Sequence, residues 1–183
     1  MNKRMRLLLP LLAFALHAEN VHLQLDSAQT EVDYVVDSTL HTVHGTFKLK
    51  RGDLTFDPAS GQASGELVVD AASGQSGSNG RDHRMSESIL ESGRFPEIAF
   101  RPDRVEGKVE PAGHYQVQLH GRFSLHGAEH ELTVPLTVDA GNGTYRAVAT
   151  FEVPYIKWGL KNPSTFILRV SDKVAITVKT VAR

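Results

Sequence analysis

The stretch HYQVQLHGRFSLHGAEHELTVPLTV, residues 114–138, contains two runs in which apolar and polar residues alternate. The apolar residues of the first run, 114–126, are Tyr115, Val117, Leu119, Phe123 and Leu125. Those of the second run, 130–138, are Leu132, Val134, Leu136 and Val138. Alternation with a period of two is typical of a strand with one apolar and one solvated face. The two runs, separated by GAE, predict an antiparallel hairpin.

The same alternation recurs on both sides of this hairpin. It is found in GTFKLKRGDLTFD (45–57), SGELVVD (64–70), FPEIAFRP (95–102), TYRAVATFEV (144–153) and SDKVAITVKTV (171–181). Short strands joined by Gly-rich and Asp-Pro turns predict an all-β domain of about eight antiparallel strands, either a barrel or a sandwich. A closed barrel of that size either fills its interior with side chains or holds one small ligand.

One segment breaks this all-β pattern. After the glycine-rich SGQSGSNG, the sequence RDHRMSESILESG (81–93) predicts a short helix, with Asn79 as its cap and Gly93 at its end. Met85 and Ile89 are four residues apart and share one face of this helix. Set between two strands, a one-sided helix either plugs a barrel end or forms a lid over its mouth.

The first 18 residues have the features of a secretory signal peptide. A basic start is followed by an apolar run, 7–16, which is too short to span a bilayer, and Ala18 fits a cleavage site. We therefore expect a leader at 1–18 and a single mature domain at 19–183. The expected location is the periplasm or the exterior, with the mature protein soluble.

Composition narrows the classes of function. The chain has no cysteine, which excludes disulfides, thiolate metal sites, a cysteine nucleophile and a lipid-modified cysteine. Losing Lys3, Arg4 and Arg6 with the leader reduces 20 basic residues to 17 against 21 acidic ones, a net charge of −4. This balance argues against nucleic acid or an anionic membrane surface as the partner.

The segment RDHRMSESILESGRFPEIAF, residues 81–100, resembles the signature of the YceI-like family of exported proteins. Residues 45–70, the central hairpin and the last strand are similar to the corresponding family segments. The resemblance implies a lipocalin-like antiparallel barrel that holds a polyisoprenoid, an isoprenoid quinone or a fatty-amide-like lipid in an apolar cavity. It implies no catalysis, cofactor or metal. Residues 37–47 and 153–170 depart from the usual family sequence.

The resemblance and the apolar stripes together suggest the binding residues. Arg81 and Asp82 correspond to the family's Arg-Asp pair, which either meets a polar head group at the mouth or fixes the backbone near the helix. Met85 and Ile89 match the helix's apolar positions. Trp158 is expected to contact the ligand at the rim or to plug one barrel end. The expected cavity wall comprises Phe47, Leu49, Leu67, Val69, Ile98, Phe100, Val117, Leu119 and Phe123.

A His-dependent metal hydrolase is the alternative function. His41 and His44 could bind zinc together with a third histidine. The candidates for this third ligand are His120, His126 and His130. A spacing of three puts His41 and His44 on opposite faces of a strand unless the strand bulges, and no organised catalytic motif is present.

A third alternative is an interaction module without a ligand. A homodimer across one barrel face would need an unusually apolar outer surface, and Val148 between Arg146 and Thr150 is the one hint of it. For the lipid-binding function, a membrane redox partner is a candidate partner, because a carrier of an isoprenoid quinone would deliver it to such a protein.

Overall fold

A computed structural model describes residues 20–183, so the predicted leader at 1–18 lies outside the described residues. The strands are β1 (Val21–Gln24), β2 (Glu31–Asp37), β3 (Thr42–Phe56), β4 (Ala63–Gln75), β5 (Glu97–Glu106), β6 (Gly113–Leu125), β7 (Ala128–Gly141), β8 (Thr144–Val153) and β9 (Val174–Ala182). The helical segments are η1 (Ser27–Gln29), α1 (Asn79–Arg84) and η2 (Met85–Ile89). Within this part of the chain, no helix has both the length and the apolar character needed to cross a membrane.

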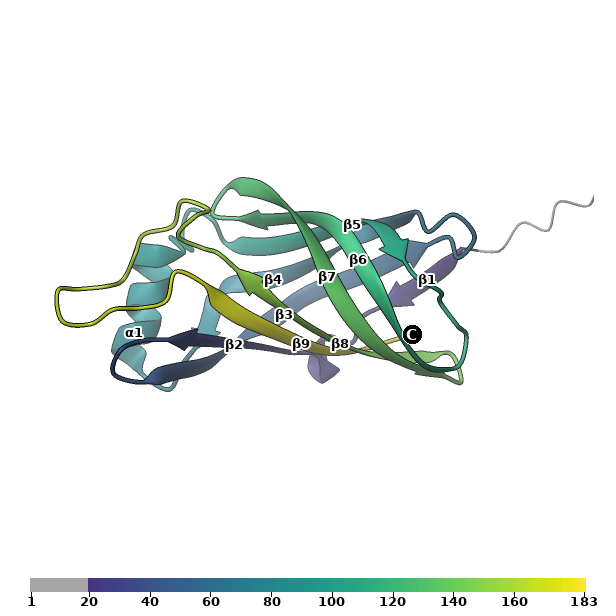
Figure 1. Ribbon diagram of the computed structural model, residues 1–183, viewed down its shortest axis with the longest axis horizontal. Helices are drawn as coiled ribbons and strands as arrows, with labels where there is room; N and C mark the ends of the chain where they lie inside the picture. Colours follow the sequence, from purple (N-terminus) through teal and green to yellow (C-terminus); the bar gives the residue numbers. More distant parts are fainter. Residues whose placement is uncertain (1–19) are drawn as a thin grey trace, which may run out of the picture.

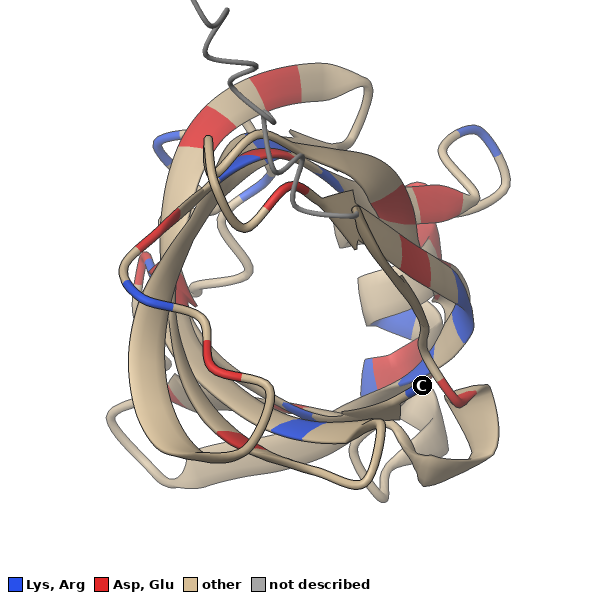
Figure 2. Ribbon diagram, turned by 90° about the vertical axis from the view of Figure 1, so that its right-hand side faces the viewer, with Lys and Arg blue, Asp and Glu red and all other residues tan. Residues whose placement is uncertain are grey.

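The strands form one closed antiparallel barrel (Figures 1 and 2). Each strand from β3 to β9 pairs with the next, and β2 closes the barrel by pairing with both β3 and β9. β2 pairs with the N-terminal part of β3, and β1 pairs with its C-terminal part along the same edge. β1 and β2 therefore occupy the position of one interrupted strand. The predicted barrel of about eight strands with one short helix between strands is therefore confirmed, and the sandwich alternative is wrong.

Two tight turns set the register of the strands from β6 to β8. His126 and Gly127 have φ values of 52° and 78°, and Asn142 and Gly143 have 52° and 69°. Positive φ at both central residues matches the twist of antiparallel strands in a two-residue hairpin. Because the first turn needs only these two residues, β7 already begins at Ala128, and the prediction of a longer GAE connection was wrong.

The barrel encloses a long apolar interior. Cross-strand partners such as Leu119 and Val134 lie on the same face of the sheet, so the predicted stripes of β6 and β7 point inward together. β6 has 13 residues. At about 3.3 Å per residue and a tilt of about 40°, such a strand spans roughly 30 Å along the barrel axis.

The helix after β4 closes the end of the barrel opposite the C-terminus (Figure 1). α1 continues into a π-helical turn, in which the Leu90 amide donates to the Met85 carbonyl at 2.8 Å. This wider turn brings Leu90 into the same buried cluster as Met85 and Ile89.

Both predicted ends of the helix were wrong. The N-cap is Ser78, and Asn79 is already helical, because the extended backbone that a cap requires occurs one residue earlier. At the other end, the residue with left-handed backbone is Glu91, with φ of 48°, and not Gly93. The π-helical turn ends the helix at Ile89, four residues before Gly93.

Candidate functional site

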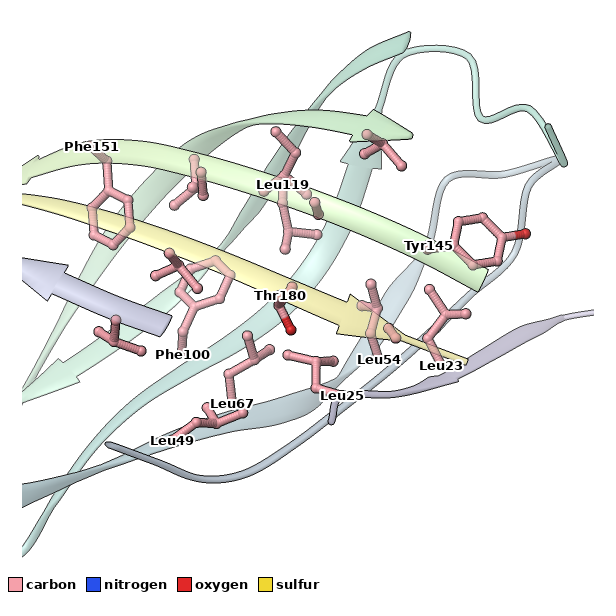
Figure 3. Close-up of a pocket in the computed structure, with 18 of the residues that line it drawn as sticks. Leu23, Leu25, Leu49, Leu54, Leu67, Phe100, Leu119, Tyr145, Phe151 and Thr180 are labelled. Carbon is pink, nitrogen blue, oxygen red and sulfur yellow. The ribbon is translucent and has the colours of Figure 1, made fainter. Parts of the chain in front are cut away.

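The barrel interior contains a cavity of about 210 Å³ toward the end that carries the C-terminus (Figure 3). Its walls come from strands all around the barrel, and nearly all of its lining side chains are apolar. The polar exceptions are the hydroxyl groups of Thr180, Tyr115 and Tyr145. We call this space cavity 1.

All nine residues of the expected wall line cavity 1. They are Phe47, Leu49, Leu67, Val69, Ile98, Phe100, Val117, Leu119 and Phe123. Sequence reasoning missed other lining residues, among them Leu23, Leu25, Val134, Leu136, Val138, Ala147, Ala149, Phe151 and Val178. Most of these occupy apolar stripes of β7, β8 and β9, so the alternation that identified the strands also contained the signal for this part of the wall.

A second cavity, of about 460 Å³, lies beneath the helix and is called cavity 2. Met85, Ile89 and Leu90 form its helical side. Its other lining residues come mainly from β2, from the turn that follows β2 and from the segment between β8 and β9, and include Tyr34, Val36, Val43, Tyr155, Leu160, Pro163, Leu168 and Val170. Its lining also includes Ser38 and His41 and, unlike that of cavity 1, the charged side chains of Arg81 and Arg84.

Four apolar side chains line both cavities. They are Phe47, Ile98, Phe123 and Ile176, which come from β3, β5, β6 and β9. The cavities therefore meet at a common apolar constriction. An apolar chain that passed this constriction would extend from the helix end of the barrel toward the opposite end.

The Arg-Asp pair fixes the backbone of the glycine-rich segment that precedes the helix. Arg81 Nε donates to Ser76 Oγ at 2.7 Å, and Arg81 Nη2 donates to the Ser76 carbonyl at 2.8 Å. Asp82 accepts hydrogen bonds from the amide of Ser76, at 2.9 Å, and from its hydroxyl. Arg81 also lines cavity 2, whereas Asp82 does not. The pair thus has the backbone-fixing geometry that was one of the two expectations, and only Arg81 faces the cavity.

A second anchor holds the far end of the helix. Glu91 lies 3.0 Å from Lys161 Nζ, in the segment between β8 and β9, and 3.3 Å from His126 Nε2, in the β6–β7 turn. The hydrogen bond from Lys161 is the main cause that lowers the pKa of Glu91. The helix is thus tied at both ends to neighbouring segments of the barrel end.

Two tyrosines, Tyr34 and Tyr155, contribute neutral aromatic side chains to the wall of cavity 2. Burial raises the pKa of Tyr155 to about 12, and its hydroxyl donates to the Ser171 carbonyl at 2.7 Å. Burial is also the main cause that raises the pKa of Tyr34, which is hydrogen-bonded to Ser76. Both phenols therefore stay neutral at physiological pH and present rings to the cavity.

Trp158 lines neither cavity. Its indole stacks on the His130 ring, with centroids 4.1 Å apart and an interplanar angle of 3°, and lies 5.6 Å from the Phe123 ring. His130 pairs with Phe123 across β6 and β7 and so lies on the inward face. This placement is that of a plug at the barrel end and gives no support to a ligand contact at the rim.

The histidines proposed for zinc are dispersed. His41 lines cavity 2, whereas His44 is exposed on β3. His120 contacts Asp103 at 2.6 Å, and His126 contacts Glu91. Among residues 20–183, no group of three or more His, Cys, Asp or Glu side chains is arranged to hold a metal ion.

Comparisons with solved structures show where this fold occurs. BcnA from Burkholderia cenocepacia is similar with a TM-score of 0.71 and 20% sequence identity, over 87% of this chain and 99% of that chain. A polyisoprenoid binding domain from Saccharophagus degradans gives 0.65 and 15%, over 88% and 97%. A YceI protein from Campylobacter jejuni gives 0.55 and 12%, over 99% and 90%. At these identities the likeness establishes the fold alone.

Comparison with sequence families gives the assignment. None of the curated proteins compared with this chain matches it. The model of the YceI-like domain, however, matches residues 23–182, which span all nine strands apart from the first residues of β1. The chain therefore belongs to the YceI-like family.

Proposed function

We propose that this protein binds the long apolar tail of a polyisoprenoid, or of a similar lipid such as an isoprenoid quinone, inside its barrel and does so without catalysis. The observation that carries the proposal is the pair of adjoining cavities, with a lining that is apolar except at one end. The solved polyisoprenoid binding domain from Saccharophagus degradans has the same fold, which supports this class of ligand.

The energetics favour a long tail. Apolar surface removed from water contributes about 25 cal/mol per Å², from which the cost of ordering the tail must be subtracted. A lumen of roughly 30 Å, estimated from strand length and tilt, is comparable to the thickness of a bilayer's hydrocarbon core. It therefore suits an extended chain better than a compact ligand.

The polar groups suggest the orientation of the ligand. Ser38, His41, Arg81 and Arg84 all line cavity 2, whereas cavity 1 offers hydroxyl groups alone. We therefore place the head group at the helix end and the tail past the constriction into cavity 1. The family resemblance and the predicted leader at 1–18 further support a carrier or store of lipid that is exported to the periplasm or beyond.

A pair of neighbouring residues on β8 tests this proposal. Ala149 lines cavity 1 and is buried, whereas Val148 points outward and is 43% exposed. Ala149→Phe places a phenyl ring inside cavity 1 and excludes part of the tail from it. The variant should therefore bind a fluorescent polyprenyl analogue at least about tenfold more weakly than the parent. Val148→Phe is the matched control and should bind like the parent. Equal binding by all three proteins would contradict a tail in cavity 1.

A further inference from the structure

Three of the four exposed large hydrophobic side chains among the described residues lie at one end of the barrel. Leu40, in the turn between β2 and β3, is 69% exposed, and Phe166 and Ile167, in the segment between β8 and β9, are 96% and 80% exposed. Phe166 and Ile167 form the tip of a turn in which the Thr165 amide donates to the Leu168 carbonyl at 2.7 Å. Figure 1 shows both segments projecting beyond the strands at the helix end. We call Leu40, Phe166 and Ile167 the apolar tip.

The two segments that carry the apolar tip are joined by hydrogen bonds. The Thr39 amide donates to the Arg169 carbonyl at 2.9 Å, and the Arg169 amide approaches Thr39 Oγ1 at 3.3 Å. Ser38 and Val170 form an antiparallel bridge beside them. The tip is thus one surface with a defined arrangement, and exposed apolar surface of this kind marks interaction sites with proteins or membranes.

The charges around the tip distinguish these two partners. Asp37, at the end of β2, borders the first segment, but residues 38–42 and 161–169 contain no Asp or Glu, whereas Lys161 and Arg169 flank the tip. Arg169 has no ion pair within the described part of the chain, while Lys161 contacts the helix carboxylate described above. Apolar residues with flanking cations fit the head-group region of an anionic bilayer. The net charge of −4 that residues 19–183 carry without the predicted leader does not oppose this, because charges beyond about 8 Å are screened at physiological ionic strength.

The apolar tip adjoins the mouth of cavity 2. Leu40 precedes His41, and Ile167 precedes Leu168, and both of the following residues line that cavity. We propose that the apolar tip inserts into the head-group region of an anionic lipid bilayer and thereby holds the mouth of cavity 2 against the membrane. The inference of membrane docking depends only on the exposed residues of the apolar tip and the charges beside them. Its use, direct passage of a lipid tail between bilayer and barrel, rests on the proposed function.

Vesicle flotation of the mature protein tests the docking. The probe is a vesicle of phosphatidylethanolamine with phosphatidylglycerol, compared with one of phosphatidylcholine alone. The parent should float with the anionic vesicles and more weakly with the neutral ones. The triple variant Leu40→Ser, Phe166→Ser, Ile167→Ser should lose at least about tenfold in vesicle affinity, because three apolar contacts are removed. Val148→Ser, at the fourth exposed hydrophobic residue, is the control and should match the parent.

The outcomes separate docking from ligand binding. The tip side chains are exposed, so the triple variant should unfold at the parent's temperature and still bind a fluorescent polyprenyl analogue in solution. A parent that stays in the aqueous fraction, or a triple variant that floats like the parent, overturns the docking and leaves a protein partner as the occupant. Failure of every protein to bind the analogue would overturn the proposed function, yet the flotation result would still decide the docking.

Discussion

Met85 occupies the space that a side chain at Gly74 would fill. A Cβ atom built on Gly74 would overlap the Met85 methyl group and lie 2.8 Å from the Phe47 ring. The missing side chain on β4 therefore lets the helix approach the barrel and brings Met85 against the constriction between the cavities. This close approach of helix and strand determines how the barrel end is closed.

A side chain added at Gly74 should weaken the packing of the helix against the barrel. Gly74→Val overpacks the contact, and we expect it to lower the free energy of unfolding by about 1–3 kcal/mol in urea titration. Gly93→Val is the control, because no atom lies within 4 Å of a Cβ atom there. A Gly74→Val protein as stable as the control variant would show that the helix does not depend on this contact.

The apolar face of the helix should matter for binding more than for folding. Met85→Asp combined with Ile89→Asp places two carboxylates at the wall of cavity 2, so affinity for a fluorescent polyprenyl analogue should fall while the barrel remains folded. His83→Asp with Glu87→Asp changes two exposed positions of the same helix at the same spacing and should bind normally. Unchanged binding by the Met85/Ile89 variant would rule out a lid that contacts the ligand.

An ion pair on the outer surface of the barrel should make stability depend on acid pH. Hydrogen bonds first from Arg51 and then from Lys50 lower the pKa of Glu97 from 4.5 to about 2. A carboxylate with a lowered folded-state pKa stabilises the fold above its unfolded pKa, and this contribution is lost as pH falls through the folded value.

The corresponding variant is Glu97→Gln. It should be less stable than the parent at neutral pH, and the difference should shrink from about pH 4.5 downward and vanish near pH 2. Glu131→Gln, at an exposed carboxylate of β7 with no ion pair among residues 20–183, should show no such trend. A Glu97→Gln difference that stays constant with pH would contradict the assigned cause.

The barrel was predictable because alternation is a local property. On β6 the period of two gave nearly the observed bounds, and the same pattern on β9 identified Ile176 and Val178, which line the interior. β2, EVDYVVD, was missed although it also alternates, with Val32 and Tyr34 buried and Glu31 exposed.

Cavity 2 was not predictable in the same way. Ser38, His41, Leu160 and Leu168 lie in segments without periodicity, and tertiary hydrogen bonds bring these segments together. The π-helical turn was also hidden, because the spacing of Met85 and Ile89 fits an ordinary helical turn equally well. Long-range pairing, which no local pattern reports, shapes this end of the barrel.

Native mass spectrometry would show whether the barrel holds a lipid. The mature protein would be purified from an exporting host without detergent, and any released mass would be extracted with solvent and identified. We expect one apolar adduct per chain, a polyisoprenoid or a lipid with a similar tail. A bare barrel that also fails to take up such a lipid, or a barrel loaded with zinc, would contradict this expectation.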